Sequence, residues 1–371
     1  METVGNSSAL VERVRNSFLS ESRQLQFTSP LFASLAASCA SDPDMLMLGK
    51  NVKPGQPVGR FVLLAAHFLI MSEPDATVGE YFKSVTALPK PYSDAFSEFR
   101  AFCIDRRAQL EWLLATRTVN TTLPDRASYI LPALYAVSSM VQQPLNIIEI
   151  GCSAGLNLIF DAYKYDYGDG AMCGDPESPL ALCCTVIGGA PGAGLEIPRI
   201  EKRVGIDLVR VDLSDASERR WIEAMLLPEW ERDRERLKLA LSLAAKRQLE
   251  VLEEDAINAL PAILETMTGP VCIINSHVLY QWPQHLIEEL DRLLRCRGRS
   301  RPIHRLDIEA VEHESQEAMR ARLIRLAKAG FSLTEKSMAS DIVHYRYENG
   351  ACEKTQLGIT DGFGRWIDWQ I

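Results

Sequence analysis

The stretch Asn146-Ile-Ile-Glu-Ile-Gly-Cys-Ser-Ala-Gly-Leu-Asn157 decides the fold. Its first residues, 146–150, have the length and apolar composition of a buried strand. The strand ends in a turn that contains Gly151, Ser153 and Gly155, and helical spacing follows over 156–165. A strand, a glycine turn and a helix in this order bring backbone N–H groups close to an anionic or polar ligand. The pattern predicts an α/β fold with a site for a nucleotide-like cofactor.

The residues after this stretch continue the alternation of short apolar runs and helical segments that is typical of a parallel sheet. We expect strands at 203–207, 248–253 and 271–275, and helices at 213–245, 256–267 and 285–295. The Gly- and Pro-rich segment 168–198 precedes the second strand, and we interpret it as an inserted hairpin. Alternating apolar and polar residues near the end predict antiparallel strands at 331–338, 342–347 and 365–369.

The first part of the chain has a different texture, in which helical spacing is broken by Pro and Gly. Helices are expected at 9–20, 30–40, 60–71, 94–116 and 125–141. We therefore predict a helical N-terminal cap domain over residues 1–143. A Rossmann-like domain over residues 144–371 follows it, with the inserted hairpin near 168–198.

The charge of the chain limits its partners. The 371 residues carry a formal net charge of −9, from 40 Lys and Arg against 49 Asp and Glu. This excess of negative charge would repel a phosphate backbone, so we expect no nucleic-acid partner. Five arginines between Arg295 and Arg305 are a local exception. We interpret them as a solvated loop after a helix rather than as a site for an anionic substrate.

Cysteine usage and hydropathy indicate the compartment. The nine cysteines form no C-x-x-C pair and have none of the spacings typical of a zinc site, so we expect reduced thiols and no metal. The longest apolar run, 61–71, is interrupted by His67 and is too short to span a bilayer. The first 20 residues lack the pattern of an export signal. We expect a cytoplasmic protein that does not associate with a membrane.

The spacing of the glycine turn distinguishes between cofactors. A dinucleotide fingerprint G-x-G-x-x-G would need glycines at 151, 153 and 156, where Ser153 and Leu156 break it. The letters E-x-G-x-S-x-G instead resemble the first motif of Rossmann-like S-adenosylmethionine-dependent methyltransferases, with Ser153 in place of the usual middle glycine. The resemblance implies that Glu149 and Gly151 lie near the methionine end of S-adenosylmethionine, and that Gly155 lets helix and strand pack closely.

Two other interpretations of the turn stay open. The same letters spell G-x-S-x-G, the nucleophile elbow of α/β-hydrolases, with Ser153 as nucleophile. Asp255 and then His277 or His344 follow in the required chain order. Such an elbow follows several earlier strands, whereas here 145 residues of mostly helical pattern precede the first strand. In the third interpretation the glycines serve packing alone.

Polar residues at the ends of the later strands complete the expected site. Asp207 would accept the two ribose hydroxyls of an adenosyl group, and Asp255 would meet its adenine amino group. Either carboxylate could instead cap a helix or end a strand in solvent. Asn275 and His277 would lie near the acceptor, with His277 as a general base for an acceptor hydroxyl. A histidine with satisfied hydrogen bonds at a strand end is the alternative.

Along nearly its whole length the sequence resembles the bacterial family known as domain of unknown function 2332. The resemblance rests on segments 113–117, 148–157, 203–208, 220–221 and 364–369, with Asp161, Tyr163, Tyr165, Asp166 and Tyr167. It implies a methyltransferase-like fold and brings no established activity. Two positions depart from the family pattern: 120–123 read Asn-Thr-Thr-Leu in place of Gln-Thr-Asn-Glu, and Phe363 stands in place of a histidine.

The expected fold class is α/β: a Rossmann-like methyltransferase sheet with an N-terminal helical domain and antiparallel C-terminal strands. The expected function is methyl transfer from S-adenosylmethionine to a small-molecule acceptor. The helical domain would form one wall of the acceptor site, with the loop 117–126 nearest the donor methyl group. The alternative function is non-catalytic binding of S-adenosylmethionine or another nucleotide.

Overall fold

The computed structural model describes residues 2–168, 170, 172–189, 191, 194–311, 314–331 and 339–371, with side chains from residue 9 onward. It divides into two compact units, of which the first comprises Met1–Thr121 and Ser214–Lys238, and the second Thr122–Leu213 and Leu239–Ile371. Whereas the expected boundary is residue 143, helix α7 (Ala127–Val141) falls in the second unit. The first unit is built from two separate stretches of the chain.

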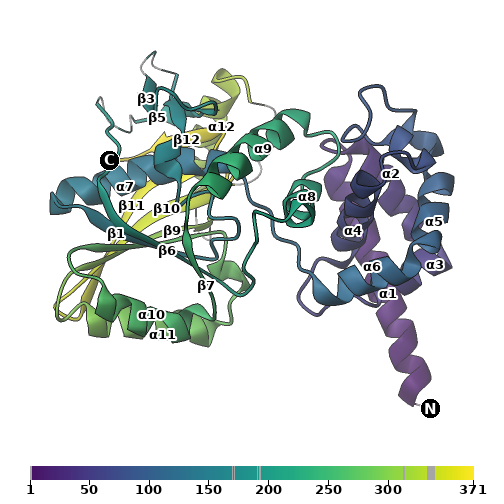
Figure 1. Ribbon diagram of the computed structural model, residues 1–371, viewed down its shortest axis with the longest axis horizontal. Helices are drawn as coiled ribbons and strands as arrows, with labels where there is room; N and C mark the ends of the chain where they lie inside the picture. Colours follow the sequence, from purple (N-terminus) through teal and green to yellow (C-terminus); the bar gives the residue numbers. More distant parts are fainter. Residues whose placement is uncertain are drawn as a thin grey trace. The chain divides into compact units, whose positions relative to one another are not determined.

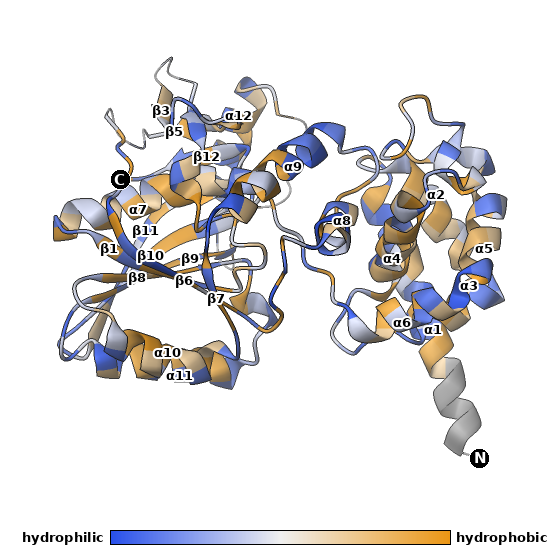
Figure 2. Ribbon diagram, in the orientation of Figure 1, coloured by the Kyte–Doolittle hydropathy of each residue, from blue (hydrophilic) through white to orange (hydrophobic). Residues whose placement is uncertain are grey.

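The first unit is helical. Its elements are α1 (Glu2–Leu25), α2 (Pro30–Cys39), α3 (Pro43–Gly49), α4 (Val58–Ser72), η1 (Thr77–Tyr81), η2 (Tyr92–Asp94), α5 (Ala95–Asp105), α6 (Arg107–Thr116), α8 (Ala216–Ala224) and the start of α9 (Glu231–Lys246). The apolar helix α4, largely orange in Figure 2, packs against α1, α6 and α8. The α4 residue His67 is buried, and its ring nitrogens bond to Ala224 O at 3.0 Å and Ser84 Oγ at 2.7 Å.

Two long helices expected in this part of the chain are each divided. The expected helix 94–116 becomes α5 and α6, because the backbone leaves helical geometry at Arg106, whose φ is −100° and ψ 19°. The expected helix 213–245 becomes α8 and α9, separated by a turn that contains Pro228. Proline has no backbone N–H to continue a helix. Within the described residues, no helix is long and apolar enough to cross a membrane.

The second unit is built on a sheet that has nine strands within the described residues. The order is β5-β12-β11-β10-β9-β8-β1-β6-β7. Their bounds are β1 (Leu145–Ile150), β5 (Thr185–Gly188), β6 (Ile200–Asp207), β7 (Glu250–Glu253), β8 (Val271–Ser276), β9 (Ile303–Ala310), β10 (Ser340–Glu348), β11 (Ala351–Thr360) and β12 (Trp366–Trp369). The strands from β9 to β7 are parallel, as expected for β8, β1, β6 and β7, whereas β9 is not among the strands expected from the sequence. The predicted antiparallel strands 342–347 and 365–369 are also confirmed, whereas 332–338 lies outside the described residues.

Helices cover both faces of this sheet. Figure 1 shows α10 (Ala256–Thr266) and α11 (Gln284–Arg297) on one face and α7 on the other. On the first face, Ile148 of β1 and Ile273 of β8 belong to one hydrophobic cluster with Leu260 of α10 and Leu290 of α11. This buried apolar layer fixes the strands whose carboxyl ends hold the expected site. A further helix, α12 (Gln316–Lys328), follows β9 in the chain.

The helix expected at 156–165 does not form. The glycine turn is followed instead by further turns, the short helix η4 (Phe160–Ala162) and β2 (Lys164–Asp166). Tyr163 OH donates to Leu156 O at 2.9 Å and Tyr165 OH to Phe160 O at 2.5 Å. Their spacing of two predicts alternation between core and surface, yet both rings are fully buried. Contacts of the hydroxyls with nearby carbonyls therefore take precedence over the local helical spacing.

The inserted segment 168–198 is more than the hairpin that the sequence predicts. β2 forms a small sheet with β3 (Met172–Gly174) and β4 (Ala181–Cys183), in the order β3-β2-β4. β5, from the same segment, instead pairs with β12 at the edge of the large sheet. The partner of β5 is distant in sequence, and local patterns do not specify it.

Only residues 298–302 of the segment 295–305 form the loop expected from its arginines. Arg295 lies in the last turn of α11 and pairs with Asp291 at 2.6 Å. Arg305 lies in β9, is 4% exposed and donates to Asp307 at 2.8 Å. The sequence does not predict β9, because Arg305 and Asp307 occupy buried positions where a buried-strand pattern needs apolar residues.

Candidate functional site

The carboxyl ends of β1 and β8 meet where the order of the sheet reverses. From β1 the chain adds β6 and then β7 on one side, after which β8 and β9 are added on the other. Ligands of open α/β sheets bind at this kind of switch point, outside the carboxyl ends of the strands. Glu149 and Gly151 mark this end of β1, and Ser276 and His277 mark this end of β8. The topology therefore brings two of the expected groups of residues to one edge.

The glycine turn after β1 is tightly held by its own chain. Gly151, Ser153 and Gly155 have φ values of +70°, +49° and +71°, a region that favours glycine. The N–H of Gly151 donates to Ile206 O at 2.8 Å, and the N–H of Ser153 donates to Asp207 Oδ2 at 2.8 Å. The turn is thus fixed against the end of β6. It does not open an α-helix, although the sequence predicts one.

Side chains fill the space beside the glycines. A Cβ added to Gly151 would lie 2.2 Å from Val278 Cγ2, and one added to Gly155 would lie 2.6 Å from Leu249 Cδ1. Real Cβ contacts essentially never come this close. The glycines are required at both positions by packing within the protein, whichever ligand binds nearby.

Glu149, next to the turn, has a buried carboxyl group that is only partly hydrogen-bonded. Its side chain is buried, and Oε1 accepts a hydrogen bond from Asn157 Nδ2 at 2.7 Å. The second oxygen, Oε2, is buried without a hydrogen-bond partner. Burial raises the pKa of Glu149 to about 8, against the smaller opposing effect of the Asn157 hydrogen bond. At neutral pH the carboxyl group therefore carries a proton and presents one unsatisfied oxygen.

Asp207 and Asp255 each bond to backbone of this chain. Asp207 Oδ1 accepts the N–H of Val209 at 3.2 Å, and its other oxygen accepts that of Ser153. Burial raises the pKa of Asp207, and these N–H groups oppose the increase. Asp255 is the N-cap of α10 and accepts the N–H of Ile257 at 2.9 Å. Carboxylate oxygens have two lone pairs each, so these bonds do not use the full acceptor capacity of either side chain.

The structure places Asn275 on the opposite face of the sheet from Glu149. Asn275 pairs in register with Ile150, whereas Glu149 pairs with Ile274. In-register neighbours point to the same face and successive residues alternate, so Asn275 shares the face of Ile150. There it is buried beside Asp307, its in-register partner on β9. Asn275 and Glu149 therefore face opposite sides of the sheet.

His277 lies directly beyond β8 in a left-handed conformation, with φ +57°. Its N–H donates to Ile308 O at 2.8 Å, and its imidazole Nε2 is buried without a hydrogen-bond partner. Burial lowers the pKa of His277 to about 3, and the positive charge of Arg126 lowers it further. The imidazole is therefore neutral at physiological pH and has an unused nitrogen.

Two segments that the sequence does not connect complete this edge. The Arg126 Nε donates to Gly362 O at 3.2 Å, and a Cβ added to Gly362 would lie 2.9 Å from the His277 ring. On the other side, Tyr129 OH and Ser276 Oγ are 3.0 Å apart. The expected loop 117–126 thus contributes Arg126 to the site in the second unit.

The geometry also bears on the hydrolase interpretation. The left-handed φ of Ser153 is the strained conformation that a nucleophile elbow needs. No α-helix follows it directly, however, because turns lead to η4 and β2, and β1 is the first strand in chain order among the described residues. Neither candidate histidine bonds to its hydroxyl: His344 Nε2 bonds to His304 at 2.9 Å, and His277 Nε2 has no partner. The contacts of a catalytic triad are not formed around Ser153.

The chain matches a known protein family over most of its length. A family model with the description "Uncharacterized protein conserved in bacteria" matches residues 15–369. No curated protein and no solved structure matches the chain. The match includes both units and every candidate site residue discussed above.

Proposed function

The chain belongs to the bacterial family known as domain of unknown function 2332, and we propose that its second unit binds S-adenosylmethionine at the carboxyl ends of β1 and β8. We further propose that it transfers the methyl group to a small acceptor. The observation that carries the proposal is the buried, unpartnered Oε2 of Glu149 beside a glycine turn at the switch point of a parallel sheet.

The order of the parallel strands supports a Rossmann-like methyltransferase core. Counting along the chain, the parallel strands β7, β6, β1, β8 and β9 read third, second, first, fourth and fifth across the sheet. This is the doubly wound arrangement in which the first strand lies beside the switch point. Antiparallel strands extend the sheet beyond β9.

The residues present fit a ligand with a positive charge near Glu149. Bound S-adenosylmethionine would supply an electrophilic methyl group together with a cationic ammonium group. A cation beside Glu149 would favour its ionised form and would give Oε2 a partner. Asp207, at the end of the adjacent strand, retains lone pairs for ribose hydroxyls.

The acceptor side would depend on His277 and its surroundings. The neutral imidazole has Nε2 available to hold a proton from an acceptor hydroxyl. Arg126 adds positive charge beside this ring and beside Glu149, which favours an acceptor that carries negative charge. Positioning of donor and acceptor would account for most of the acceleration, because the reaction requires little covalent chemistry from the protein.

Non-catalytic binding is the second candidate, and one observation favours it. The pKa of His277, lowered to about 3, makes this imidazole a weak base at physiological pH. A protein that senses the cofactor needs the binding residues around Glu149 but no competent base. Measured turnover distinguishes the two candidates, because both predict binding.

Isothermal titration calorimetry with S-adenosylmethionine and S-adenosylhomocysteine tests the proposal. We expect both to bind, and Glu149→Gln to weaken the binding of each by about tenfold, the scale of a lost charge-assisted contact. Glu254→Gln is the matched control, since Glu254 follows β7 at the same sheet edge and is exposed. Its affinity should stay within about twofold. An absence of heat with both ligands at millimolar concentration would refute the cofactor assignment.

A further inference from the structure

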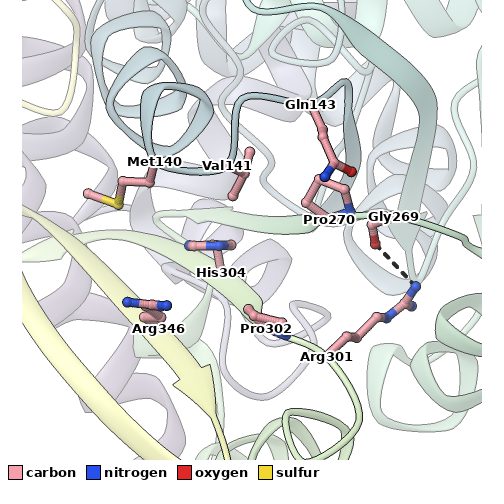
Figure 3. A pocket seen from close by; sticks show the side chains of 9 residues that line it. All are labelled: Met140, Val141, Gln143, Gly269, Pro270, Arg301, Pro302, His304 and Arg346. Carbon is pink, nitrogen blue, oxygen red and sulfur yellow. Dashed lines mark hydrogen bonds between the residues drawn. The ribbon is translucent and has the colours of Figure 1, made fainter.

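A cavity of the same unit opens at the amino ends of the parallel strands, opposite to the glycine turn. It has a volume of about 440 Å³ and is lined by Met140, Val141, Gln143, Gly269, Pro270, Arg301, Pro302, His304 and Arg346 (Figure 3). Gly269 and Pro270 lead into β8, and Arg301 and Pro302 lead into β9. Because β1 spans six residues at about 3.3 Å each, this cavity lies roughly 20 Å along the strands from the glycine turn. It is therefore separate from the site proposed above.

The sheet supplies two basic side chains to the cavity. His304 on β9 and Arg346 on β10 are in-register partners and share one face of the sheet. Figure 3 shows their side chains next to each other below the end of α7. Arg346 also pairs with Glu348 at 2.6 Å, and Glu353 is its in-register partner on β11. The nine lining residues themselves include two arginines and no carboxylate.

His304 lines this space and has a ring nitrogen without a hydrogen-bond partner. The side chain is 2% exposed, its Nδ1 lies 2.9 Å from His344 Nε2, and the two rings stack with centroids 5.1 Å apart. Its other nitrogen, Nε2, is buried without a hydrogen-bond partner. When His344 Nε2 donates to His304 Nδ1, the neutral His304 carries its proton on Nε2 and can donate it to a ligand. A buried polar atom of this kind is normally satisfied by protein, water or ligand.

Arg301 is held rigidly at the edge of the cavity. Its guanidinium donates to the carbonyl oxygens of Leu264 at 2.6 Å, Gly269 at 3.2 Å and Met267. The bond to Gly269 is the dashed line in Figure 3. Carbonyl groups satisfy the N–H donors but bring no negative charge, and burial lowers the pKa of Arg301. A bound anion would offset this cost without requiring the side chain to move.

The remaining walls are apolar. Met140 and Val141 come from the end of α7, and Pro270 and Pro302 face them from the two loops that precede β8 and β9. Apolar walls around a few convergent polar groups are typical of pockets that bind small molecules. They indicate a ligand with a compact apolar body in addition to its charged group.

We propose that this cavity binds a small anion, a carboxylate or a phosphate ester, whose charge faces Arg346 and Arg301 and accepts a hydrogen bond from His304 Nε2. Its apolar part lies against Met140 and Val141. The proposal does not depend on the site at the glycine turn, because no residue is shared between the two.

Calorimetry with three probes of one shape tests the proposal on the full chain. The probes are benzoate, phenyl phosphate and the uncharged benzamide. We expect benzoate or phenyl phosphate to bind, with benzamide at least about tenfold weaker, because a charge-assisted hydrogen bond is lost. The anion that binds with the higher affinity identifies which anionic group the site prefers. Equal affinity for all three probes, or binding of none, would overturn the proposal.

Variants locate the binding to this cavity. Arg346→Gln should weaken the preferred anion by about tenfold or more, and Met140→Trp, at a residue with an exposed side chain, should block it by filling the apolar wall. Arg295→Gln is the control, because it removes an arginine that pairs with Asp291 outside the cavity. The affinity of this variant for the preferred anion should stay within about twofold of that of the unmodified protein. Unchanged binding in both cavity variants would place the anion elsewhere, and unchanged circular dichroism confirms that each variant is folded.

Discussion

Asn157 donates a 2.7 Å hydrogen bond to Glu149 across the buried glycine turn, and the other oxygen of the same carboxyl group has no partner. The two residues are eight positions apart. The bond fixes the orientation of the carboxyl group before any ligand binds. It also makes Glu149 a group whose protonation is linked both to folding and to ligand binding.

Replacing Glu149 with Gln should stabilise the protein at alkaline pH. Burial raises the pKa of Glu149 from 4.5 to about 8, so the folded state keeps a proton that the unfolded chain loses. The stability from this group is complete below pH 4.5 and falls by about 1.4 kcal/mol per pH unit until pH 8. Urea denaturation should show a higher free energy of unfolding for Glu149→Gln at pH 8 and equal values at pH 4.5. A difference that does not change with pH would contradict this prediction.

Binding of S-adenosylmethionine should release a proton from Glu149. The carboxyl group is protonated at neutral pH and would ionise beside a cation. Calorimetric heats at pH 7 should therefore depend on the ionisation enthalpy of the buffer, and affinity should rise from pH 6 to pH 8. In Glu149→Gln the buffer dependence should vanish. Buffer-independent heats for the unmodified protein would show that Glu149 does not ionise on binding.

The contact between Gly151 and Val278 should make two substitutions compensate each other. Gly151→Ala places a methyl group 2.2 Å from Val278 Cγ2 and should destabilise the fold by about 1–3 kcal/mol. Val278→Ala opens that space. The double variant should therefore be more stable than the summed losses of the two single variants predict. Part of the loss should persist, because φ of +70° is strained for alanine. Strictly additive free energies of unfolding would show that the two residues do not meet.

Asp255 offers a test that separates capping from cofactor binding. Asp255→Ala removes the acceptor for the N–H of Ile257 and should cost about 1 kcal/mol, whereas Asp255→Asn keeps a capping oxygen and should cost less. If Asp255 serves as a cap alone, both variants should bind S-adenosylmethionine with unchanged affinity. Equal losses of affinity in both, with stability restored in Asp255→Asn, would indicate direct contact with the ligand.

The buried pair of Arg305 and Asp307 should be costly to break and inexpensive to replace. Asp307→Ala leaves the Arg305 guanidinium, which stacks 4.3 Å from the Tyr345 ring, without its carboxylate, and should cost about 3–5 kcal/mol. The double change Arg305→Met with Asp307→Leu removes both charges and should cost less than Asp307→Ala alone. Chemical denaturation measures both. A double variant less stable than Asp307→Ala would mean that the pair itself stabilises the fold.

The strands of the parallel sheet were predictable because each is a short run of apolar residues, as in 146–150 and 271–275. β9 was not, since Arg305 and Asp307 are buried within it. The helix expected at 156–165 fails for a different reason: its tyrosines bond to nearby carbonyls, and β2 pairs with strands further along the chain. Local periodicity contains no information about either partner.

The candidate site likewise contains residues that the sequence predicts and residues that it does not. Glu149, Gly151 and His277 follow strands with clear patterns, and the sequence places them at one edge of the sheet. The approach of Arg126 and Gly362 depends on segments more than two hundred residues apart, which no local motif links. The face occupied by Asn275 depends on strand register, because a shift of one residue would reverse it.

The division of the first unit into two stretches has a consequence for synthesis of the protein. Its hydrophobic core includes Trp221, Ala224 and Leu227, and His67 bonds to the carbonyl of Ala224. When Thr121 has been added to the growing chain, these partners have not yet been made. At about 5–20 residues per second, the 117 residues from 122 to 238 take roughly 6–23 s to translate. The helices made first must therefore wait on the ribosome, with apolar surface uncovered, until a later part of the chain completes their core.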